Sequence, residues 1–358
     1  MARIDLVDIG HRYPAPHGAD ADWALKPMTL TWNDGGAYAL LGPSGCGKTT
    51  LLNIISGLLA PTQGRIEFDA RDVTTNDPQS RNIAQVFQFP VVYDTMTVFD
   101  NLAFPLRNRR WKAGAIRERV HEVAAILELS PVLAHRAAGL SADVKQKISL
   151  GRGLVRPDVA AVLFDEPLTV IDPHLKWLLR RKLKQIHQQL RLSMIYVTHD
   201  QTEALTFADQ VVVMSQGEVV QAGTPEALFE TPAHRFVGHF IGTPGMNFIP
   251  CTWREGVTLI GSVPVTTSSG TAPASLTHLV VGIRPDYVGV VAAPMANALP
   301  ARILSVKDQG TSCMVQLSVA DTLVWAKLRD RTALPADNAF VHLPSQRCAL
   351  YANDRRVP

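Results

Sequence analysis

A glycine-rich stretch between two apolar runs carries the most specific chemistry in this sequence. Residues 42–50 fit the spacing G-x-x-x-x-G-K-[ST]. Glycines let the backbone curl so that its N–H groups point at a phosphate, and a following helix adds the positive end of its dipole. Lys48 supplies a mobile charge for the outer phosphates, and Thr49 supplies a hydroxyl for Mg²⁺. The sequence therefore predicts a nucleoside triphosphate site built by Gly42, Pro43, Ser44, Gly45, Cys46, Gly47, Lys48, Thr49 and Thr50.

Four polar residues follow other short apolar runs. Asp165 and Glu166 end the run at 161–164, and we expect Asp165 to hold the metal while Glu166 polarises an attacking water. Gln88 and His199 each end a further apolar run. Because the carboxyl ends of parallel strands form the ligand crevice of an α/β sheet, all four side chains are expected there, with Gln88 offering its amide to the metal and the water.

Unbroken apolar strands alternate with helical patterns over the first two thirds of the chain. Strands are expected at 36–41, 159–164 and 193–197, and helices at 112–135, 141–154 and 173–191. Ser141 is the expected N-cap of the second of these helices. This pattern favours a mostly parallel sheet that is covered on both faces.

The composition changes near residue 240, where short segments rich in Val, Thr and Gly begin. These segments predict a small all-β barrel. We therefore expect an α/β P-loop NTPase domain over 1–240, with a helical subdomain over about 90–157, and a β-barrel domain over 241–358.

The bulk properties exclude several classes of protein. The net charge of +3 is too small to indicate nucleic-acid binding. The four cysteines lack C-x-x-C spacing, so neither a metal knuckle nor a disulfide framework is expected, and a reducing compartment fits. The chain has no apolar run of 18 residues and no secretory h-region at its start, so we expect any membrane to be reached through a partner.

The order of the motifs resembles the ATP-binding subunits of ABC transporters over residues 1–240. The matching features are the Walker A loop at 42–50, the Q-loop at Gln88, a signature near 140, Walker B at 161–166, the D-loop at Asp172 and the switch histidine His199. The resemblance implies ATP and Mg²⁺ as cofactors, with Thr49, Gln88 and Asp165 at the metal. It also implies that Glu166 is the general base, that His199 contacts the γ-phosphate, and that Tyr13 stacks on adenine. Ser141 and Asp172 would belong to the signature and the dimer interface.

The C-terminal part is similar to the regulatory barrel, of OB/TOBE-like type, in importers of the maltose and sn-glycerol-3-phosphate kind. The similarity rests on Gly-Ile-Arg-Pro-Asp at 282–286 and on the segment 236–247. It implies two membrane-spanning permease subunits and, through them, a periplasmic substrate-binding protein. It also implies a peripheral location at the cytoplasmic face of a bacterial inner membrane. The imported compound would be a sugar, a polyol, glycerol or glycerol phosphate. The barrel would either bind a regulator or effector or extend a dimer contact.

The signature departs from the family pattern Leu-Ser-Gly-Gly-Gln. Ser141 remains, but Ala142, Asp143 and Val144 replace both glycines and the glutamine. Ala142 adds a Cβ where backbone would approach a phosphate, and an inward-pointing Asp143 would repel it by roughly 3 kcal/mol. Alternatively, Asp143 stabilises the start of its helix and points away.

Because ATP sites in this family are shared between two cassettes, a homodimer would carry the altered signature twice. We therefore expect a heterodimer with a second ATP-binding subunit, with a homodimer as the alternative. Two other functions stay open: a regulatory subunit that binds ATP and scarcely hydrolyses it, and, with less support, a soluble ABC ATPase acting on DNA or ribosomes. The basic residues of 176–191 are interpreted as a solvated face.

Overall fold

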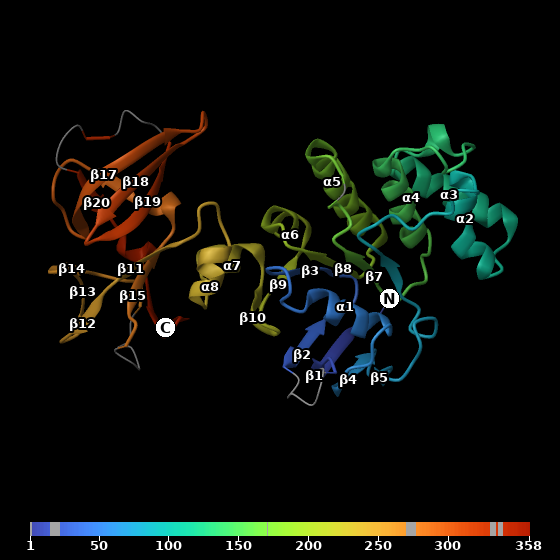
Figure 1. Cartoon of the computed structure of the whole chain (residues 1–358), viewed down its shortest axis with the longest axis horizontal. Coiled ribbons are helices and arrows are strands. Elements are labelled where there is room, and N and C mark those ends of the chain that lie inside the picture. The colour runs from blue at the N-terminus through green and yellow to red at the C-terminus, as the bar shows by residue number, and fades with distance from the viewer. Residues whose placement is uncertain (1, 15–21, 170, 270–276, 330–333, 336–338) are drawn as a thin grey trace. The chain divides into compact units, whose positions relative to one another are not determined.

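The computed structural model describes residues 2–14, 22–169, 171–269, 277–329, 334–335 and 339–358. The chain forms two compact units, residues 1–225 and 226–358 (Figure 1). The division falls at residue 225 rather than at the expected residue 240. Among the described residues, no helix has the length and apolar character needed to cross a bilayer.

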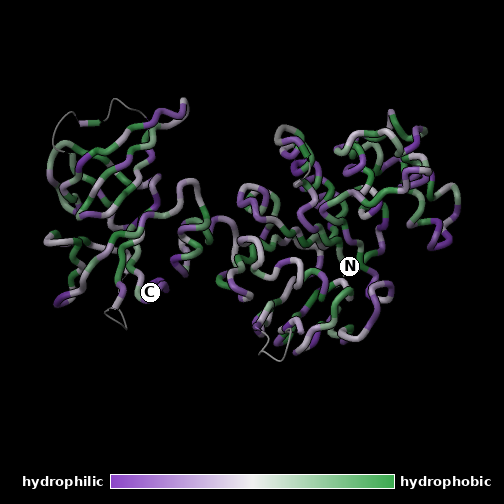
Figure 2. Tube along the Cα trace, viewed as in Figure 1, coloured by the Kyte–Doolittle hydropathy of each residue, from purple (hydrophilic) through white to green (hydrophobic). Residues whose placement is uncertain are grey.

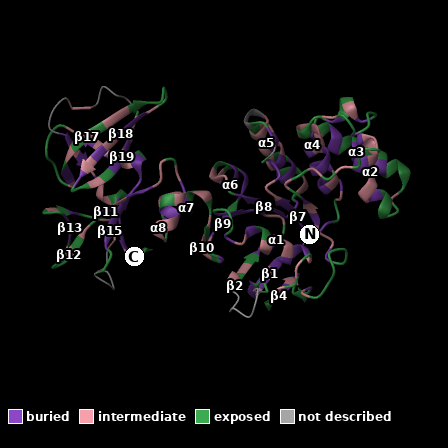
Figure 3. Ribbon diagram, in the orientation of Figure 1, coloured by how far each residue is buried: buried purple, intermediate pink, exposed green. Residues whose placement is uncertain are grey.

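The first unit is built on a six-stranded sheet of order β10-β9-β3-β8-β7-β6. Its strands are β3 (Ala37–Leu41), β6 (Ala84–Val86), β7 (Val162–Asp165), β8 (Met194–Thr198), β9 (Gln210–Ser215) and β10 (Glu218–Gly223). All neighbours are parallel except the β9–β10 hairpin. Every residue of β3 and β8 is buried, as expected for a sheet that is covered on both faces (Figure 3).

A second, antiparallel sheet of order β2-β1-β4-β5 completes this unit. It comprises β1 (Ile4–Arg12), β2 (Trp23–Trp32), β4 (Gln63–Phe68) and β5 (Arg71–Asp72). Helix α1 (Lys48–Ser56) joins the two sheets into one core, in which Leu52 packs with Leu6 of one sheet and Leu163 of the other. Figure 2 shows hydrophobic residues concentrated along the central strands. Burial of each such leucine contributes about 1.5–3 kcal/mol, so α1 is held firmly in place.

Helices cover the sheet and also form the expected helical subdomain. The elements are α2 (Val98–Asn108), α3 (Ala113–Ile126), the 3₁₀ turn Ser130–Val132, α4 (Ala142–Leu154), α5 (Pro173–Leu190) and α6 (Gln201–Phe207). The continuous helix expected over 112–135 is wrong, because α3 ends at Ile126 and Glu128 adopts a φ of 57°. Helix α2 was not singled out from the sequence, although Thr97 accepts a capping hydrogen bond from the Asp100 N–H at 3.0 Å.

The second unit is mainly β-structure, as expected. Its three sheets have the orders β11-β15-β21-β22, β12-β13-β14 and β16-β20-β17-β18-β19, and every strand pair in them is antiparallel. The strands are β11 (Asn247–Pro250), β12 (Thr252–Arg254), β13 (Val257–Ile260), β14 (Val263–Val265), β15 (Val280–Ile283), β16 (Gly289–Val291), β17 (Ala298–Asp308), β18 (Cys313–Val319), β19 (Thr322–Leu328), β20 (Ala339–His342), β21 (Ala349–Ala352) and β22 (Arg355–Arg356). One apolar core contains residues from all three sheets, including Ile260, Val281 and Leu317.

Arg284 explains why this unit begins before residue 240. Helices α7 (Pro225–Glu230) and α8 (Arg235–Phe240) precede the β-structure, and the Arg284 side chain is only 2% exposed. Its Nε donates to the carbonyl of Phe229 at 2.9 Å, and its Nη1 donates to the carbonyls of Gly238, at 2.8 Å, and Ile241. Burial lowers the pKa of Arg284 to about 10. One cation therefore binds the carboxyl ends of both helices, where the helix dipoles favour positive charge.

We expect Arg284→Met to destabilise this part of the chain by about 2–4 kcal/mol, because several buried carbonyls lose a charged donor. Denaturant unfolding of the full chain measures the loss, and faster amide hydrogen exchange over residues 226–241 locates it. Arg302→Met is the matched control, since Arg302 is exposed. Equal stability of the two variants would contradict this role for Arg284.

Candidate nucleotide-binding site

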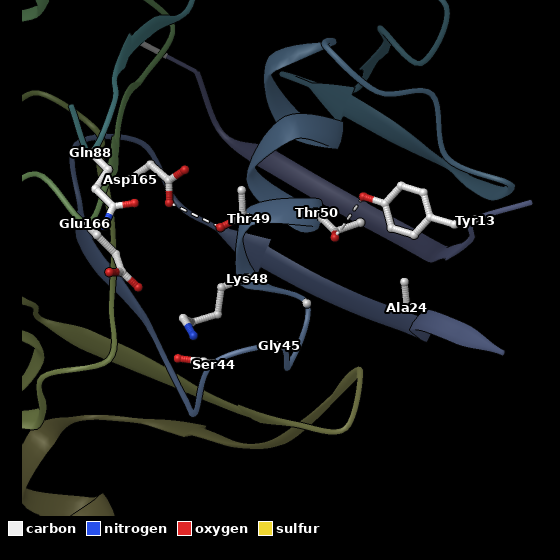
Figure 4. Close-up of a pocket in the computed structure, with 11 residues that line it drawn as sticks. Tyr13, Ala24, Ser44, Gly45, Lys48, Thr49, Thr50, Gln88, Asp165 and Glu166 are labelled. Atoms are coloured by element: carbon white, nitrogen blue, oxygen red, sulfur yellow. Dashed lines mark hydrogen bonds between the residues drawn. The ribbon is translucent and has the colours of Figure 1, made fainter. Parts of the chain in front are cut away.

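A cavity of about 480 Å³ opens where β3 ends and α1 begins (Figure 4). It is lined by Tyr13, Ala24, Ser44, Gly45, Gly47, Lys48, Thr49, Thr50, Gln88, Asp165 and Glu166. Parallel pairing accounts for this convergence, since Leu41 and Asp165, at the ends of β3 and β7, pair with neighbouring residues of β8. The cavity thus lies at the carboxyl edge of the sheet, where ligands bind in open α/β folds.

The loop over 42–47 depends on glycine at two positions. A Cβ on Gly42 would lie 2.3 Å from the carbonyl oxygen of Met214 and 2.7 Å from the Cys46 sulfur. Gly47 has a φ of 100°, and a Cβ there would lie 2.7 Å from the carbonyl oxygen of Ala24. Cys46 is buried beneath the loop, and burial raises the pKa of its thiol. Gly42, Pro43 and Cys46 therefore shape the loop without lining the cavity.

Lys48 lies at the base of the cavity and is only 5% exposed. Its ammonium group donates to the carbonyl oxygens of Gly42, at 2.8 Å, and Pro43, at 2.9 Å. These neutral acceptors hold the charge in place. Figure 4 places the Lys48 ammonium beside Ser44. A phosphate oxygen in the cavity would offer the same ammonium a stronger, charge-assisted hydrogen bond.

Three oxygen-bearing side chains meet on the other side of the cavity. The Thr49 hydroxyl donates to Asp165 Oδ1 at 3.4 Å, and Gln88 lies beside Asp165 in Figure 4. Burial raises the pKa of Asp165, and the Glu166 charge adds to this, whereas the Thr49 hydrogen bond and Lys48 act in the opposite direction. Hydroxyl, carboxylate and amide oxygens are suitable ligands for Mg²⁺, and a divalent cation would stabilise the ionised form of Asp165.

Glu166 and His199 form a pair at the edge of this cavity. His199 Nδ1 lies 3.1 Å from Glu166 Oε2. The Thr169 hydroxyl also donates to that carboxylate oxygen, at 3.3 Å. Glu166 has a φ of 45°, and its N–H donates to the Val197 carbonyl at 3.0 Å, so the turn after β7 is fixed to β8. His199 itself is half exposed and is not among the residues that line the cavity.

Tyr13 lies at the far end of the cavity from these acids (Figure 4). Its hydroxyl lies 3.2 Å from the Thr50 hydroxyl, and its ring meets the edge of His11 with a centroid separation of 4.7 Å. The ring is 48% exposed, so it remains accessible to a planar ligand.

Ser141 and Asp172 are two further predicted site residues that do not line the cavity. Ser141 occupies the N-cap position of α4 as expected, but its hydroxyl accepts no capping hydrogen bond and is exposed. Asp172 is also exposed, just before α5, and its neighbour Val170 lies outside the described residues. Ala24 is a lining residue that the sequence did not indicate, because a single alanine in a strand carries no local signal.

We expect Gly47→Ala to weaken nucleotide binding at least tenfold, because both its positive φ and its close approach to Ala24 exclude a side chain. Titration of the chain with a fluorescent ATP analogue measures this effect. Gly45→Ala provides a graded comparison, since Gly45 also has a positive φ but no atom lies within 4 Å of its added Cβ. Equal binding by the Gly47 variant and the unaltered chain would contradict this account of the loop.

Comparison with known proteins agrees with this geometry. The family model "ABC transporter" matches residues 25–169. The sn-glycerol-3-phosphate import ATP-binding protein UgpC of Chromohalobacter salexigens is 35% identical over 100% of this chain and 96% of its own length. A UgpC protein of Rhizobium johnstonii is 41% identical over 80% of this chain and 78% of its own length.

Solved structures resemble nearly two thirds of the chain. The cbiO1 protein of Clostridium perfringens, part of an ABC transporter complex, aligns with a TM-score of 0.58 at 25% identity over 64% of this chain and 90% of its own. An ATP-binding cassette solved as a dimer in a post-hydrolysis state with ADP and Pi aligns with a TM-score of 0.55 at 26% identity, over 62% of this chain and 98% of its own. Because a relative with more than 30% identity covers the whole chain, and the family model matches the region that includes the loop over 42–50, this chain belongs to the family of ABC transporter ATP-binding proteins of the importer type.

Proposed function

We propose that this chain binds Mg²⁺ and ATP at the cavity over Gly42–Thr50 and hydrolyses ATP to energise an importer. The observation that carries the proposal is the Glu166 carboxylate, held 3.1 Å from His199 at the edge of a cavity that also contains Lys48 and Asp165. Sequence relatives are named as sn-glycerol-3-phosphate import proteins, and this supports glycerol phosphate as the imported compound. A sugar, a polyol or glycerol would require the same ATP chemistry.

In this proposal each group acts on a defined part of the nucleotide. Tyr13 stacks on the adenine, the loop N–H groups bind the phosphates, and the Lys48 ammonium moves from loop carbonyls to phosphate oxygens. Mg²⁺ supplies positive charge at the outer phosphates and would be held by Thr49, Asp165 and Gln88. Glu166 accepts a proton from the attacking water, and His199 holds the carboxylate and contacts the γ-phosphate.

The remaining contacts come from partners. Ser141 and Asp172 are exposed and lie outside this chain's own cavity, and in this proposal both face a second cassette. The changes at Ala142 and Asp143 favour a second, different ATP-binding subunit whose own signature completes the site over Gly42–Thr50. Two permease subunits would place the chain peripherally at the cytoplasmic face of a bacterial inner membrane, and a periplasmic binding protein would act through them.

We expect Glu166→Gln to lower ATP turnover of the assembled transporter by at least 100-fold while ATP binding changes less than about threefold, because the amide retains the shape but accepts no proton. Phosphate release and equilibrium binding measure the two effects. Thr169→Val, which removes only a hydrogen bond to Glu166 Oε2, serves as a mild comparison. Unchanged turnover in the Glu166 variant would favour a regulatory subunit that binds ATP without hydrolysing it at this site.

The subunit composition tests the heterodimer. Purification of the assembled transporter through a tag on a permease subunit is expected to yield one copy of this chain and one copy of a second ATPase, as counted by native mass spectrometry. Restoring glycine at both altered positions, by Ala142→Gly with Asp143→Gly, is then expected to increase turnover of any homodimer that forms. Two copies of this chain with full turnover would contradict the heterodimer.

A further inference from the structure

One face of α4 is bound along its length to the segment that carries Gln88. The contacts from α4 are spaced as neighbours on one helical face. They comprise Lys145 with the Asp94 carboxylate at 2.8 Å, the Ser149 hydroxyl with the Val91 N–H at 3.4 Å, Arg152 with the Val91 carbonyl, and Arg156, just beyond the helix, with the Ile83 carbonyl at 3.1 Å. The helix that begins at Ser141 and the segment 83–94 are therefore joined by several hydrogen bonds.

Gln146 lies beside this face, one residue after Lys145, and reaches a second segment as well. Its Nε2 donates to the carbonyl of Pro167 at 2.7 Å and to the carbonyl of Phe87 at 3.4 Å. Phe87 directly precedes Gln88, and Pro167 directly follows Glu166. One amide group thus bonds to the backbone beside two proposed active-site residues that are carried by different strands.

The register of the β6–β7 pair shows what the two hydrogen bonds of Gln146 add. Val86 of β6 pairs with Phe164 of β7, so Gln88 and Glu166 each stand two residues beyond a paired position, where the ladder no longer fixes their spacing. A buried side chain that bonds to both backbones beyond the ladder would supply the missing constraint. Gln146 has no exposed surface, so water does not compete for its donor.

The other end of the same amide has an unusual environment. Gln146 Oε1 is buried and accepts no hydrogen bond from any described residue. An unpaired buried acceptor costs about 1–3 kcal/mol, and a residue kept only for packing would avoid this cost by being apolar. The donor function of Gln146 is therefore the feature that accounts for a glutamine at this position.

We propose that Gln146 is a positioning residue that sets the spacing between Gln88 and Glu166 and transmits movement of α4 to both. This inference rests on the proposed hydrolysis at Glu166. When a nucleotide draws Ser141, at the start of α4, towards a site shared with a second cassette, Gln146 shifts the turn after β7 in this chain. Occupancy of one shared site would in this way alter the geometry of the other.

Two variants separate the donor from the shape of the side chain. Gln146→Met retains the length but removes both polar atoms, and Gln146→Glu retains an acceptor but cannot donate when ionised. Gln85→Met is the matched control, because Gln85 lies on β6 and its buried Nε2 has no partner among the described residues.

The first measurement is amide hydrogen exchange of the nucleotide-free full chain, which does not depend on hydrolysis. Both Gln146 variants are expected to accelerate exchange at least threefold over residues 86–91 and 165–169. Gln85→Met is expected to accelerate exchange in neither segment. Acceleration in neither segment, or in only one, would overturn the proposal even if the unaltered transporter hydrolyses ATP.

The second measurement separates binding from turnover in the assembled transporter. We expect ATP affinity to change less than about twofold and kcat to fall about tenfold or more, because small displacements of catalytic groups have large effects on rate. If Gln146 only stabilises the fold, its variants would lower ATP affinity and kcat together, and both would recover at 15 °C, far below the unfolding temperature. That result would also overturn the proposal. If the unaltered complex hydrolyses no ATP, the proposed function fails, while the exchange result still decides whether Gln146 positions the two segments.

Discussion

The parallel pairing of β6, β7, β8 and β3 is the constraint on which the proposed site depends. Backbone hydrogen bonds set Val86 against Phe164, Asp165 against Val197 and Leu41 against Thr198. Each strand ends at the same edge, so the backbone pairing alone brings together residues that are far apart in the chain. The apolar core beneath, to which α1 contributes, keeps that edge fixed.

The protein groups at this edge only partly balance one another's charge. Lys48 is held by neutral carbonyls, and burial raises the pKa of Asp165. Both groups would be better stabilised by a ligand that brings anionic oxygens to Lys48 and a cation to Asp165. The charged groups of the cavity would therefore be lower in free energy with a ligand bound, and this agrees with a metal–nucleotide complex as the occupant.

The sequence predicted those parts of the molecule that depend on residues close together in the chain. The loop over 42–50, the buried strand ending at Asp165 and the buried strand just before His199 appear in the sequence as residue types at fixed spacing. The unit boundary at residue 225 did not, because it depends on Arg284, which bonds to carbonyls some 43–55 residues earlier in the chain. Gln146 was missed for the same reason, since its partners lie 59 and 21 residues away.

Helix α4 has two roles that involve different parts of the helix. On the proposal made above, its first turn serves a site completed by another chain, and that turn carries Ala142 and Asp143 in place of glycines. Its later turns bind this chain's own segment 83–94 through Gln146, Ser149 and Arg152. In that proposal, loss of the first function leaves the second intact, because most contacts to segment 83–94 come from later turns of the helix. A cassette with an altered signature can therefore retain a well-positioned site of its own, provided that its partner supplies the missing glycines.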